Sequence, residues 1–213
     1  MSSIEYKDLV AMLVAAVEEV RANHEMLSRL DSVGGDGDHG TTMLRCMEAV
    51  EKAVDESSGD HVPKLFNDAG WAVMGIDGGA TGPLFGSFFL GMSEAAETIE
   101  KLDTCGLATL FEGGLATVRR RTKAQPGDKT MVDALVPAVE AVNKAAETGA
   151  EPAEALEAAA KAAQNGAAAT RAMQARFGRA KNIGQKSVGR EDPGAASVAC
   201  IFRGFYKGAK TNA

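Results

Sequence analysis

Apolar residues recur every three or four positions along most of this chain, which is the spacing of one face of an α-helix. The periodic stretches predict eight helices, over residues 2–20, 42–57, 63–74, 83–92, 107–121, 130–148, 152–175 and 192–205. Valine, isoleucine and threonine do not gather in alternating runs, so the sequence predicts no strand. We therefore expect an all-α fold, with a single domain over residues 1–213 built from about eight helices.

Several of these helices open with residues that suit a helix start. The expected starts are Ser2 with Glu5 as a capping box, Thr130 with Asp133 as a cap and its partner, Asp192 with Pro193 as N-cap and first residue, and Pro63 and Pro83 in first turns. Pro137 lies inside a predicted helix, where it lacks a backbone donor and is expected to strain or kink the chain. Trp71 continues the apolar pattern of the third helix.

Four connections between the predicted helices are rich in glycine and polar residues: 31–42, 77–83, 122–130 and 177–192. Helices in a bundle need only a few linking residues, so long glycine-rich connections favour a functional end. These four follow the first, third, fifth and seventh helices. If neighbouring helices are antiparallel, alternate connections lie at the same end of the bundle, and we expect the four to meet at one site.

The first connection carries three carboxylates, Asp31, Asp36 and Asp38. Carboxylate oxygens suit Mg²⁺, Mn²⁺ or Ca²⁺, and three such groups so close together repel one another without a cation. We interpret them as a metal site; the alternative is a solvated turn in which Asp36 or Asp38 caps the next helix. An EF-hand is excluded, because counting from Asp36 places Met47 where the bidentate glutamate must stand. The same loop matches G-x-G-x-x-G but follows a helix, so it is rejected as a dinucleotide fingerprint.

The second connection opens directly into a helix, where exposed backbone N–H groups suit a phosphate and the Thr81 hydroxyl adds a donor. It is not a Walker A loop, because no Gly-Lys-Ser/Thr follows. Close packing of its glycines against another helix is the alternative. His39, inside the carboxylate loop, is a candidate to contact phosphate, to donate a hydrogen bond or to act as a base.

The other two connections are basic. Lys129 and the cations at 119–121 and 123 suit an anion. The alternatives are a turn followed by a helix cap for residues 125–130 and ordinary surface charge for the arginines. The fourth connection carries Arg179 among other cations. A glycine-rich segment with an arginine is the kind that closes over phosphates and shields them from water. An ordinary loop that ends in a helix cap is the alternative.

Composition and charge narrow the class of protein. Hydrophobic residues make up 45% of the chain, which excludes a disordered polymer. No stretch approaches about 20 uncharged apolar residues, and the first residues lack the parts of a signal peptide, so neither a membrane span nor secretion is expected. The net charge of −6 disfavours nucleic acid as a partner. The three cysteines form no C-x-x-C pair, so a reducing, cytoplasmic location is expected.

Taken together, the four connections resemble a known family, the L subunit of dihydroxyacetone kinase, which binds the nucleotide and donates the phosphoryl group. The matching segments, in chain order, are GDGDHGTTM, GGATGPLFGSFF, PGDKTMVDALVPA, and MQARFGRA with SVGREDPGAASV. The resemblance covers nearly the whole chain. It implies a barrel of eight antiparallel helices that holds ADP and two Mg²⁺ at one end.

The resemblance also implies roles for particular residues. Asp31, Asp36 and Asp38 match the magnesium ligands. The matching nucleotide positions are His39, Gly40, Thr41, Thr42, Ala80 and Thr81 at the phosphates, Thr122 and Met131 near the base, Arg179, and the closing loop Asp192, Pro193 and Gly194. Of these, Arg179, Thr81 and His39 are expected to act in catalysis. The family often has asparagine at position 42 and glycine at position 122.

The implied function is transfer of the terminal phosphoryl group of a Mg-bound nucleotide to dihydroxyacetone or a related small ketose. In the family, a separate K subunit holds the ketose and docks on the nucleotide end. Either ADP stays bound and is recharged by a phosphohistidine carrier protein, or ATP exchanges freely; a homodimer is compatible with both. The sequence contains no K domain, so we expect the chain alone to be inert on free sugar.

Two other functions stay open from the residues themselves. One is an all-α dimetal hydrolase that cleaves an ADP-ribose-like bond, which needs a second acidic metal motif late in the chain. The other is a non-catalytic module whose ADP- and Mg-bound form reports to a regulator.

Overall fold

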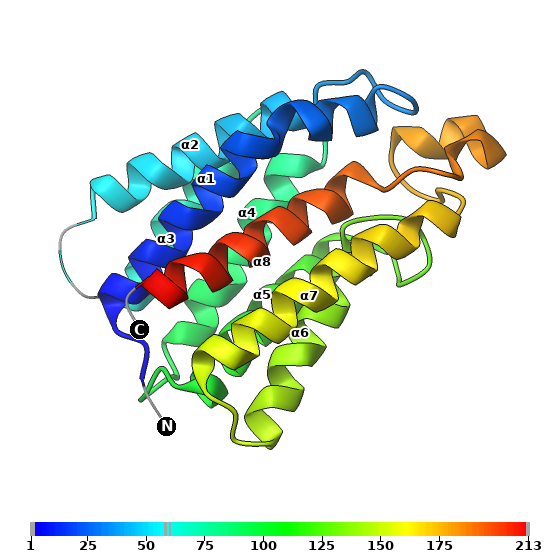
Figure 1. The fold of residues 1–213 in the computed structure, drawn as a ribbon. Helices are drawn as coiled ribbons and strands as arrows, with labels where there is room; N and C mark the ends of the chain where they lie inside the picture. The colour runs from blue at the N-terminus through cyan, green and yellow to red at the C-terminus, as the bar shows by residue number, and fades with distance from the viewer. Residues whose placement is uncertain (1–2, 58, 60, 212–213) are drawn as a thin grey trace.

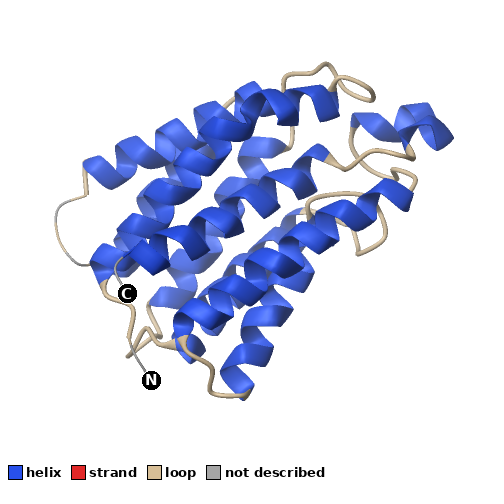
Figure 2. Cartoon of the chain, viewed as in Figure 1, coloured by secondary structure: helices blue, strands red, loops and turns tan. Residues whose placement is uncertain are grey.

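The computed structural model describes residues 3–57, 59 and 61–211, and within these ranges every regular element is helical (Figure 2). The helices are α1 (Tyr6–Asp31), α2 (His39–Asp55), α3 (Val62–Met74), α4 (Thr81–Ala96), α5 (Thr104–Arg121), α6 (Val132–Glu147), α7 (Pro152–Ala169), η1 (Thr170–Ala172), η2 (Arg179–Ser187) and α8 (Pro193–Thr211). The all-α prediction is confirmed. No helix in the described part of the chain is long and apolar enough to cross a membrane.

The eight α-helices form a closed ring. Each packs against the next along the chain, and α8 packs against both α7 and α1, which closes the barrel. Figure 1 shows neighbouring helices running in opposite directions, with both chain termini at one end of the barrel. The expected antiparallel barrel is confirmed. Even-numbered helices therefore begin, and odd-numbered helices end, at the end opposite the termini.

Phenylalanine rings from three helices pack together in the core. Phe88 of α4, Phe111 of α5, and Phe202 and Phe205 of α8 are all buried. The Phe111 ring centroid lies 5.3 Å from that of Phe202, 5.8 Å from that of Phe205 and 6.3 Å from that of Phe88. Ring pairs at this spacing add to the stabilisation from burial alone. The cluster ties α8, the last helix, to two helices from the middle of the chain.

Glycines on α8 allow it to lie close to α1. A Cβ atom on Gly204 would lie 2.3 Å from the Ala16 Cα, and one on Gly208 would lie 2.3 Å from the Ala11 carbonyl oxygen. No side chain fits at such distances, so glycine is required at both positions for the two helices to approach. This contact completes the ring.

Several helix bounds differ from the apolar pattern. Three helices begin earlier than predicted, at His39, Thr81 and Thr104 rather than Thr42, Pro83 and Leu107. Their first turns consist of polar and small residues, which carry no apolar repeat. The seventh helix ends at Ala169 instead of near residue 175, because the chain tightens into η1 there.

The predicted helix starts are only partly confirmed. Pro63 lies in the first turn of α3, and Pro137 lies inside α6, as expected. The first helix is capped by Glu5, whose N–H donates to the Asp8 Oδ2 at 2.8 Å. Ser2, the predicted cap, lies outside the described residues.

Trp71 follows the apolar pattern of α3 but does not enter the core. Its side chain is 62% exposed, whereas Leu65, Phe66 and Ala69 form the buried face of the helix. Its place in the pattern was therefore a wrong guide to burial.

Candidate functional site

All four glycine-rich connections line one cavity of about 270 Å³. In Figure 1, the helix ends joined by these connections lie at the end of the barrel opposite the chain termini. The lining includes ten predicted site residues: Asp31, His39, Ala80, Thr81, Thr122, Met131, Arg179, Asp192, Pro193 and Gly194. The other five, Asp36, Asp38, Gly40, Thr41 and Thr42, belong to the first connection and the first turn of α2. The alternation of antiparallel helices thus brings the four motifs together, as predicted.

The first connection folds around Asp31, the last residue of α1. The Gly37 N–H donates to the Asp31 Oδ2 at 2.9 Å, and the Gly35 N–H donates to the Asp31 carbonyl oxygen at 2.7 Å. A Cβ atom on Gly35 would lie 2.2 Å from the Asp31 Oδ1, and Gly37 has a φ of 77°. A side chain at position 35 would therefore displace the Asp31 carboxylate, and glycine is favoured at position 37 for its backbone conformation. Together these residues fix the Asp31 carboxylate at the cavity.

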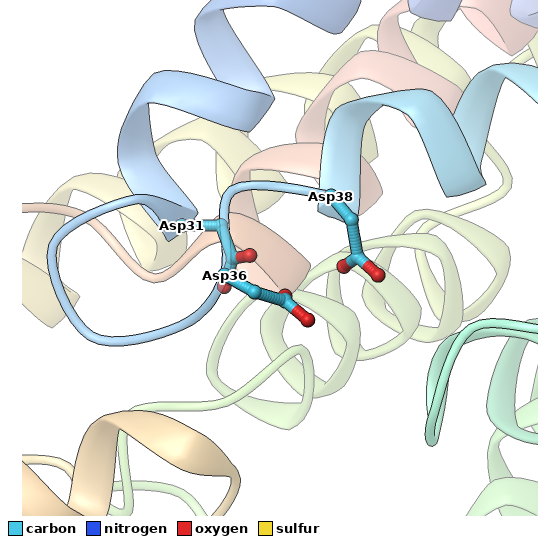
Figure 3. Close-up of side chains that lie close together, drawn as sticks. All are labelled: Asp31, Asp36 and Asp38. Carbon is cyan, nitrogen blue, oxygen red and sulfur yellow. The ribbon is translucent and has the colours of Figure 1, made fainter.

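Three carboxylates gather where this loop meets α2. Figure 3 shows the side chains of Asp31, Asp36 and Asp38 projecting to the same side. One oxygen atom of each lies within 4.8 Å of the others. Loss of solvent, and then the neighbouring Asp36 carboxylate, raise the pKa of Asp38, as expected where carboxylates share a site. An accessible, oxygen-only and negatively charged set of this kind fits Mg²⁺ or Mn²⁺, which are held by a few carboxylates together with water and phosphate.

Arg179 reaches this cluster from the fourth connection. Its guanidinium forms an ion pair with Asp36 and lies 3.9 Å from the Asp38 Oδ1. The next residue, Ala180, packs on the same loop, since a Cβ atom on Gly34 would lie 2.8 Å from the Ala180 Cβ. The fourth connection therefore spans to the first. The Arg179 side chain is 55% exposed, so it remains accessible to a ligand in the cavity.

His39 joins the starts of three helices by hydrogen bonds. Its Nε2 lies 2.8 Å from the Ser197 Oγ of α8, and its Nδ1 lies 3.3 Å from the Thr81 Oγ1 of α4. The Ser197 hydroxyl donates to the Pro193 carbonyl, so it must accept from the His39 Nε2–H, which leaves Nδ1 to accept from the Thr81 hydroxyl. Burial lowers the pKa of His39 to about 4. A neutral imidazole with both nitrogens engaged orients Thr81 and is a weak base at neutral pH.

Three helices, α2, α4 and α6, begin beside the cavity with no hydrogen bond to the N-cap side chain, but at α6 the Val132 N–H donates to the Thr130 Oγ1 at 3.2 Å. The N-cap residues of α2 and α4 are Asp38 and Ala80, and neither side chain accepts a hydrogen bond from the first turn. The first backbone N–H groups of a helix have no partner within the helix, and the helix dipole makes this end favourable for an anion. At α2 these are the N–H groups of 39–41, within the stretch that the sequence predicts to bind phosphate. At α4 the Thr81 N–H already donates to the Gly78 carbonyl oxygen at 3.3 Å and Pro83 has no N–H, so the Gly82 N–H is the group that remains.

Gly40 and Thr42 face the protein. A Cβ atom on Gly40 would lie 1.8 Å from the His24 carbonyl oxygen of α1, so this glycine permits close helix packing. The Thr42 side chain is buried against Gly78, where a Cβ atom would lie 2.3 Å from the Thr42 Cγ2. Thr41 is exposed. Gly40 can therefore reach a ligand only through its backbone, and Thr42 supports the second connection.

The cavity lining also contains the residues expected near a nucleotide base and in the closing loop. Thr122 directly follows α5, and its Oγ1 accepts from the Ala124 N–H at 3.1 Å. Met131, the residue before α6, is buried at the cavity wall. The Asp192 Oδ2 accepts from the Ala195 N–H at 2.7 Å, which confirms the predicted cap of α8.

The third connection is a tight turn held by two buried carboxylates. The Asp128 Oδ2 accepts from the Gln125 N–H at 2.8 Å, and the Asp133 Oδ2 accepts from the Thr130 N–H at 2.7 Å. The predicted pairing of Thr130 with Asp133 is therefore present, but the N-cap residue of α6 is Met131 and not Thr130. Lys129, which suited an anion in the sequence, is buried and has a φ of 61°. Its ammonium donates to backbone carbonyl groups of the protein itself.

Sequence reasoning missed the apolar part of the cavity and one polar partner. Leu84 and Phe85, in the first turns of α4, line the cavity together with Phe177. Their apolar spacing is indistinguishable from that of core residues. Ser197 was missed because only the fold brings it next to His39. Its position one turn after Pro193 was the one local signal, because it places the Ser197 hydroxyl near the first turn of α8.

The model of one protein family, the DAK2 domain, matches residues 33–207. Two curated relatives are similar over nearly their full lengths. The PEP-dependent dihydroxyacetone kinase 1, ADP-binding subunit DhaL, of Listeria innocua is 37% identical over 190 residues, which cover 89% of this chain and 90% of the relative. The PEP-dependent dihydroxyacetone kinase, ADP-binding subunit DhaL, of Escherichia coli is 35% identical over 208 residues, covering 98% and 99%.

A solved structure has the same fold. The dihydroxyacetone kinase of C. freundii, in complex with AMP-PNP and Mg²⁺, superposes with a TM-score of 0.72 and 26% sequence identity. The match covers 95% of this chain but only 34% of that chain. The chain described here thus spans about a third of that kinase.

Proposed function

The chain belongs to the DAK2 domain family, and on this basis we propose that it is the nucleotide-binding subunit of a kinase for dihydroxyacetone or a related small ketose. One observation carries the proposal: three carboxylates, two uncapped helix starts and Arg179 surround a single cavity. The carboxylates suit divalent cations and the helix starts suit phosphates. A nucleoside diphosphate or triphosphate with Mg²⁺ is the ligand that satisfies both.

In this proposal each group in the cavity has a distinct task. Asp31, Asp36 and Asp38 hold two Mg²⁺ ions, which neutralise phosphate charge when they are bound. Backbone N–H groups at the starts of α2 and α4 orient the phosphate oxygens. Arg179 turns from Asp36 to the transferred group and stabilises charge that develops there. His39 keeps the Thr81 hydroxyl aimed into the cavity.

The rest of the cavity would place the nucleoside. Thr122 and Met131 form the wall for the base, next to the apolar side chains of Leu84 and Phe85. Asp192, Pro193 and Gly194 close the cavity at the start of α8. No side chain needs to form a covalent intermediate, because positioning and charge neutralisation suffice for phosphoryl transfer.

The ketose would be held by a separate K subunit that docks at the cavity end, in the reducing cytoplasm. We expect no transfer to free ketose by this chain alone. The names of the two bacterial relatives favour the version in which ADP stays bound and is recharged by a phosphohistidine carrier protein. Free exchange of ATP is the other version.

The dimetal hydrolase has less support. It needs a second acidic metal motif, and among the described residues the Asp31, Asp36 and Asp38 cluster is the one group with suitable geometry. Asp192, the late acidic candidate, is engaged as the cap of α8.

Native mass spectrometry of the purified chain, before and after mild EDTA treatment, tests the site. We expect an added mass equal to ADP plus two Mg²⁺ that is lost on chelation, which would favour the retained coenzyme. An empty chain that binds ATP only with Mg²⁺ would favour the exchanging version. Absence of nucleotide under both conditions would overturn the proposal.

Reconstitution with a ketose-binding K subunit tests the reaction. Phosphorylated ketose should form only when both subunits, Mg²⁺ and a phosphoryl source are present. Nucleotide binding without transfer to any small ketose would favour the non-catalytic module, and release of ADP-ribose from a suitable substrate would favour the hydrolase.

A further inference from the structure

Lys129 is buried, with 4% of its surface exposed, although lysine side chains mostly reach solvent. Its Nζ donates to the Thr170 carbonyl oxygen at 2.6 Å and also to the Arg190 carbonyl oxygen. Thr170 is where the chain leaves α7, and Arg190 is where it returns towards α8. One ammonium group therefore joins the two ends of the intervening stretch, which we call the 171–190 segment.

Other contacts also hold the base of the 171–190 segment, among them an ion pair in which the Arg171 Nη2 lies 3.0 Å from the Glu191 Oε1. The Gly189 N–H donates to the Arg171 carbonyl oxygen at 2.7 Å, and the Asp192 N–H donates to the Thr170 Oγ1 at 2.8 Å. These contacts join the same two stretches of chain, next to Thr170 and next to Arg190, that Lys129 joins. Lys129 differs because it comes from the third connection, so it also fixes the base relative to α6.

The same turn contacts the segment a second time. The Arg176 N–H donates to the Asp128 carbonyl oxygen at 3.1 Å, and its guanidinium lies 3.3 Å from the Asp128 Oδ1. Further along, Arg179 pairs with Asp36 and lies across the cavity. The turn that contains Asp128 and Lys129 thus fixes the position of the backbone that leads to Arg179.

A cap for the last carbonyls of α7 would explain only half of this geometry. A cation near a helix C-terminus is favourable, which accounts for the bond to Thr170. It does not account for the bond to Arg190, which belongs to no helix. Burial lowers the pKa of Lys129, while the nearby carboxyl groups of Asp192, Asp133 and Glu191 favour its charged form. These carboxyl groups offset part of the cost of burying the ammonium.

We propose that Lys129 is a positioning residue that holds the two ends of the 171–190 segment together and so fixes Arg179 over the cavity. The tether is a property of the fold. Its consequence for phosphoryl transfer rests on the proposed function, because there Arg179 is the group that acts on the phosphate.

Hydrogen exchange on the nucleotide-free chain tests the tether without any activity. Lys129→Met keeps an unbranched side chain of similar size at the left-handed position but removes all three donors. We expect amides in peptides covering 171–192 to exchange on the order of tenfold faster, with the barrel helices unchanged. The matched control is Lys161→Met, an exposed lysine on α7, which should leave exchange as in the parent. Unchanged exchange in Lys129→Met would overturn the tether.

A double-mutant cycle on the reconstituted kinase tests whether Lys129 acts through Arg179. Lys129→Met should lower kcat on the order of tenfold or more, with the KM for nucleotide changed by less than about threefold. With Arg179→Ala already present, adding Lys129→Met should lower kcat by less than about twofold. An equal loss in both backgrounds would show that Lys129 acts independently of Arg179 and would overturn its positioning role.

The hydrogen-exchange experiment and the kinetic experiment test the tether and the proposed function separately. If the parent chain shows no transfer with any K subunit, the kinase proposal fails while the exchange result still decides the tether. If Lys129→Met does not give a cooperative thermal transition, Lys129→Gln replaces it, because a shorter amide donor retains part of the tether. That variant should show the same two effects at smaller size, and their absence would count equally against the proposal.

Discussion

The two ends of the barrel are made by the same helices, yet their helix starts are completed differently. At the end with the chain termini, α1, α3, α5 and α7 begin with hydrogen bonds between side chains and backbone N–H groups. The pairs are Asp8 with Glu5, His61 with Lys64, Asp103 with Cys105 and Gly106, and Glu154 with Glu151. At the cavity end, the starts of α6 and α8 have such bonds to Asp133 and Asp192, but the N-cap side chains of α2 and α4 accept none.

At the terminal end, side chains of the protein itself bond to the N–H groups at every helix start, whereas at the cavity end two helix starts lack such bonds. A helix start normally gains about 1 kcal/mol from its cap, so two uncapped starts at one end forgo stability. The same end gathers the carboxylates of Asp31, Asp36 and Asp38, which repel one another. Both features become favourable once phosphate and divalent cations occupy the cavity. Substitutions at the cavity end should therefore change ligand binding and transfer, and those at the terminal end should change stability.

The largest effect is expected for Asp36→Ala at the cavity end. Loss of one carboxylate from the metal cluster should weaken Mg²⁺-dependent nucleotide binding by at least about 100-fold, the upper range for outer-shell partners of metal sites. Isothermal titration calorimetry with ADP and Mg²⁺ measures this loss. The metal-free thermal midpoint should change little, since the substitution removes repulsion with Asp38 but also an exposed ion pair with Arg179. Retention of nucleotide equal to that of the parent would refute the metal assignment.

Arg179→Ala should separate transfer from binding. Removing one donor that stabilises transition-state charge typically lowers kcat by about 10²-fold or more. Nucleotide affinity should change by only a few fold, because the helix starts and the metal cluster remain. Steady-state kinetics with the K subunit, together with calorimetry, measure both quantities. The opposite pattern, weak binding with kcat preserved, would make Arg179 a binding residue alone.

The sequence predicted the fold and the meeting of the connections because both follow from local rules. Apolar spacing marked the helices, and the alternation of their directions placed the connections 31–42, 77–83, 122–130 and 177–192 at one end. The predicted residues Asp31, His39 and Thr81 line this cavity, since glycine-rich loops with polar residues are visible in a sequence.

What the sequence could not predict depends on contacts across the fold. The position of Ser197 beside His39 joins residues that are far apart in the chain. Lys129 was interpreted as a cation that suits an anion, because nothing local shows that its ammonium meets two distant carbonyl groups. Trp71 was placed in the apolar pattern of α3 because it is apolar, but at about 100° per residue it lies on the side of the helix away from Leu65 and Ala69.

Gly208→Ala should affect the terminal end alone. The added Cβ would lie 2.3 Å from the Ala11 carbonyl oxygen, so α8 and α1 must move apart. Overpacking of this kind costs about 1–3 kcal/mol, which chemical denaturation measures directly. Gly35→Ala is the matched change at the cavity end, where the new Cβ would displace the Asp31 carboxylate and weaken Mg²⁺ binding instead. If Gly208→Ala weakened nucleotide binding as strongly as Gly35→Ala, the two ends would not be independent.

The smallest effect, and the sharpest control for Asp36→Ala, is expected for Asp103→Ala. The Asp103 Oδ1 accepts from the Cys105 and Gly106 N–H groups, so its loss leaves the start of α5 uncapped like the starts at the other end. The variant should lose about 1 kcal/mol of stability, a fall of about 2–4 °C in the thermal midpoint, and Asp103→Ser should recover most of it. Calorimetry should find nucleotide binding equal to that of the parent. Asp103 would then stabilise a helix, whereas Asp36 at the other end would bind the ligand. Weakened nucleotide binding in Asp103→Ala would instead show that a change at the terminal end affects the cavity.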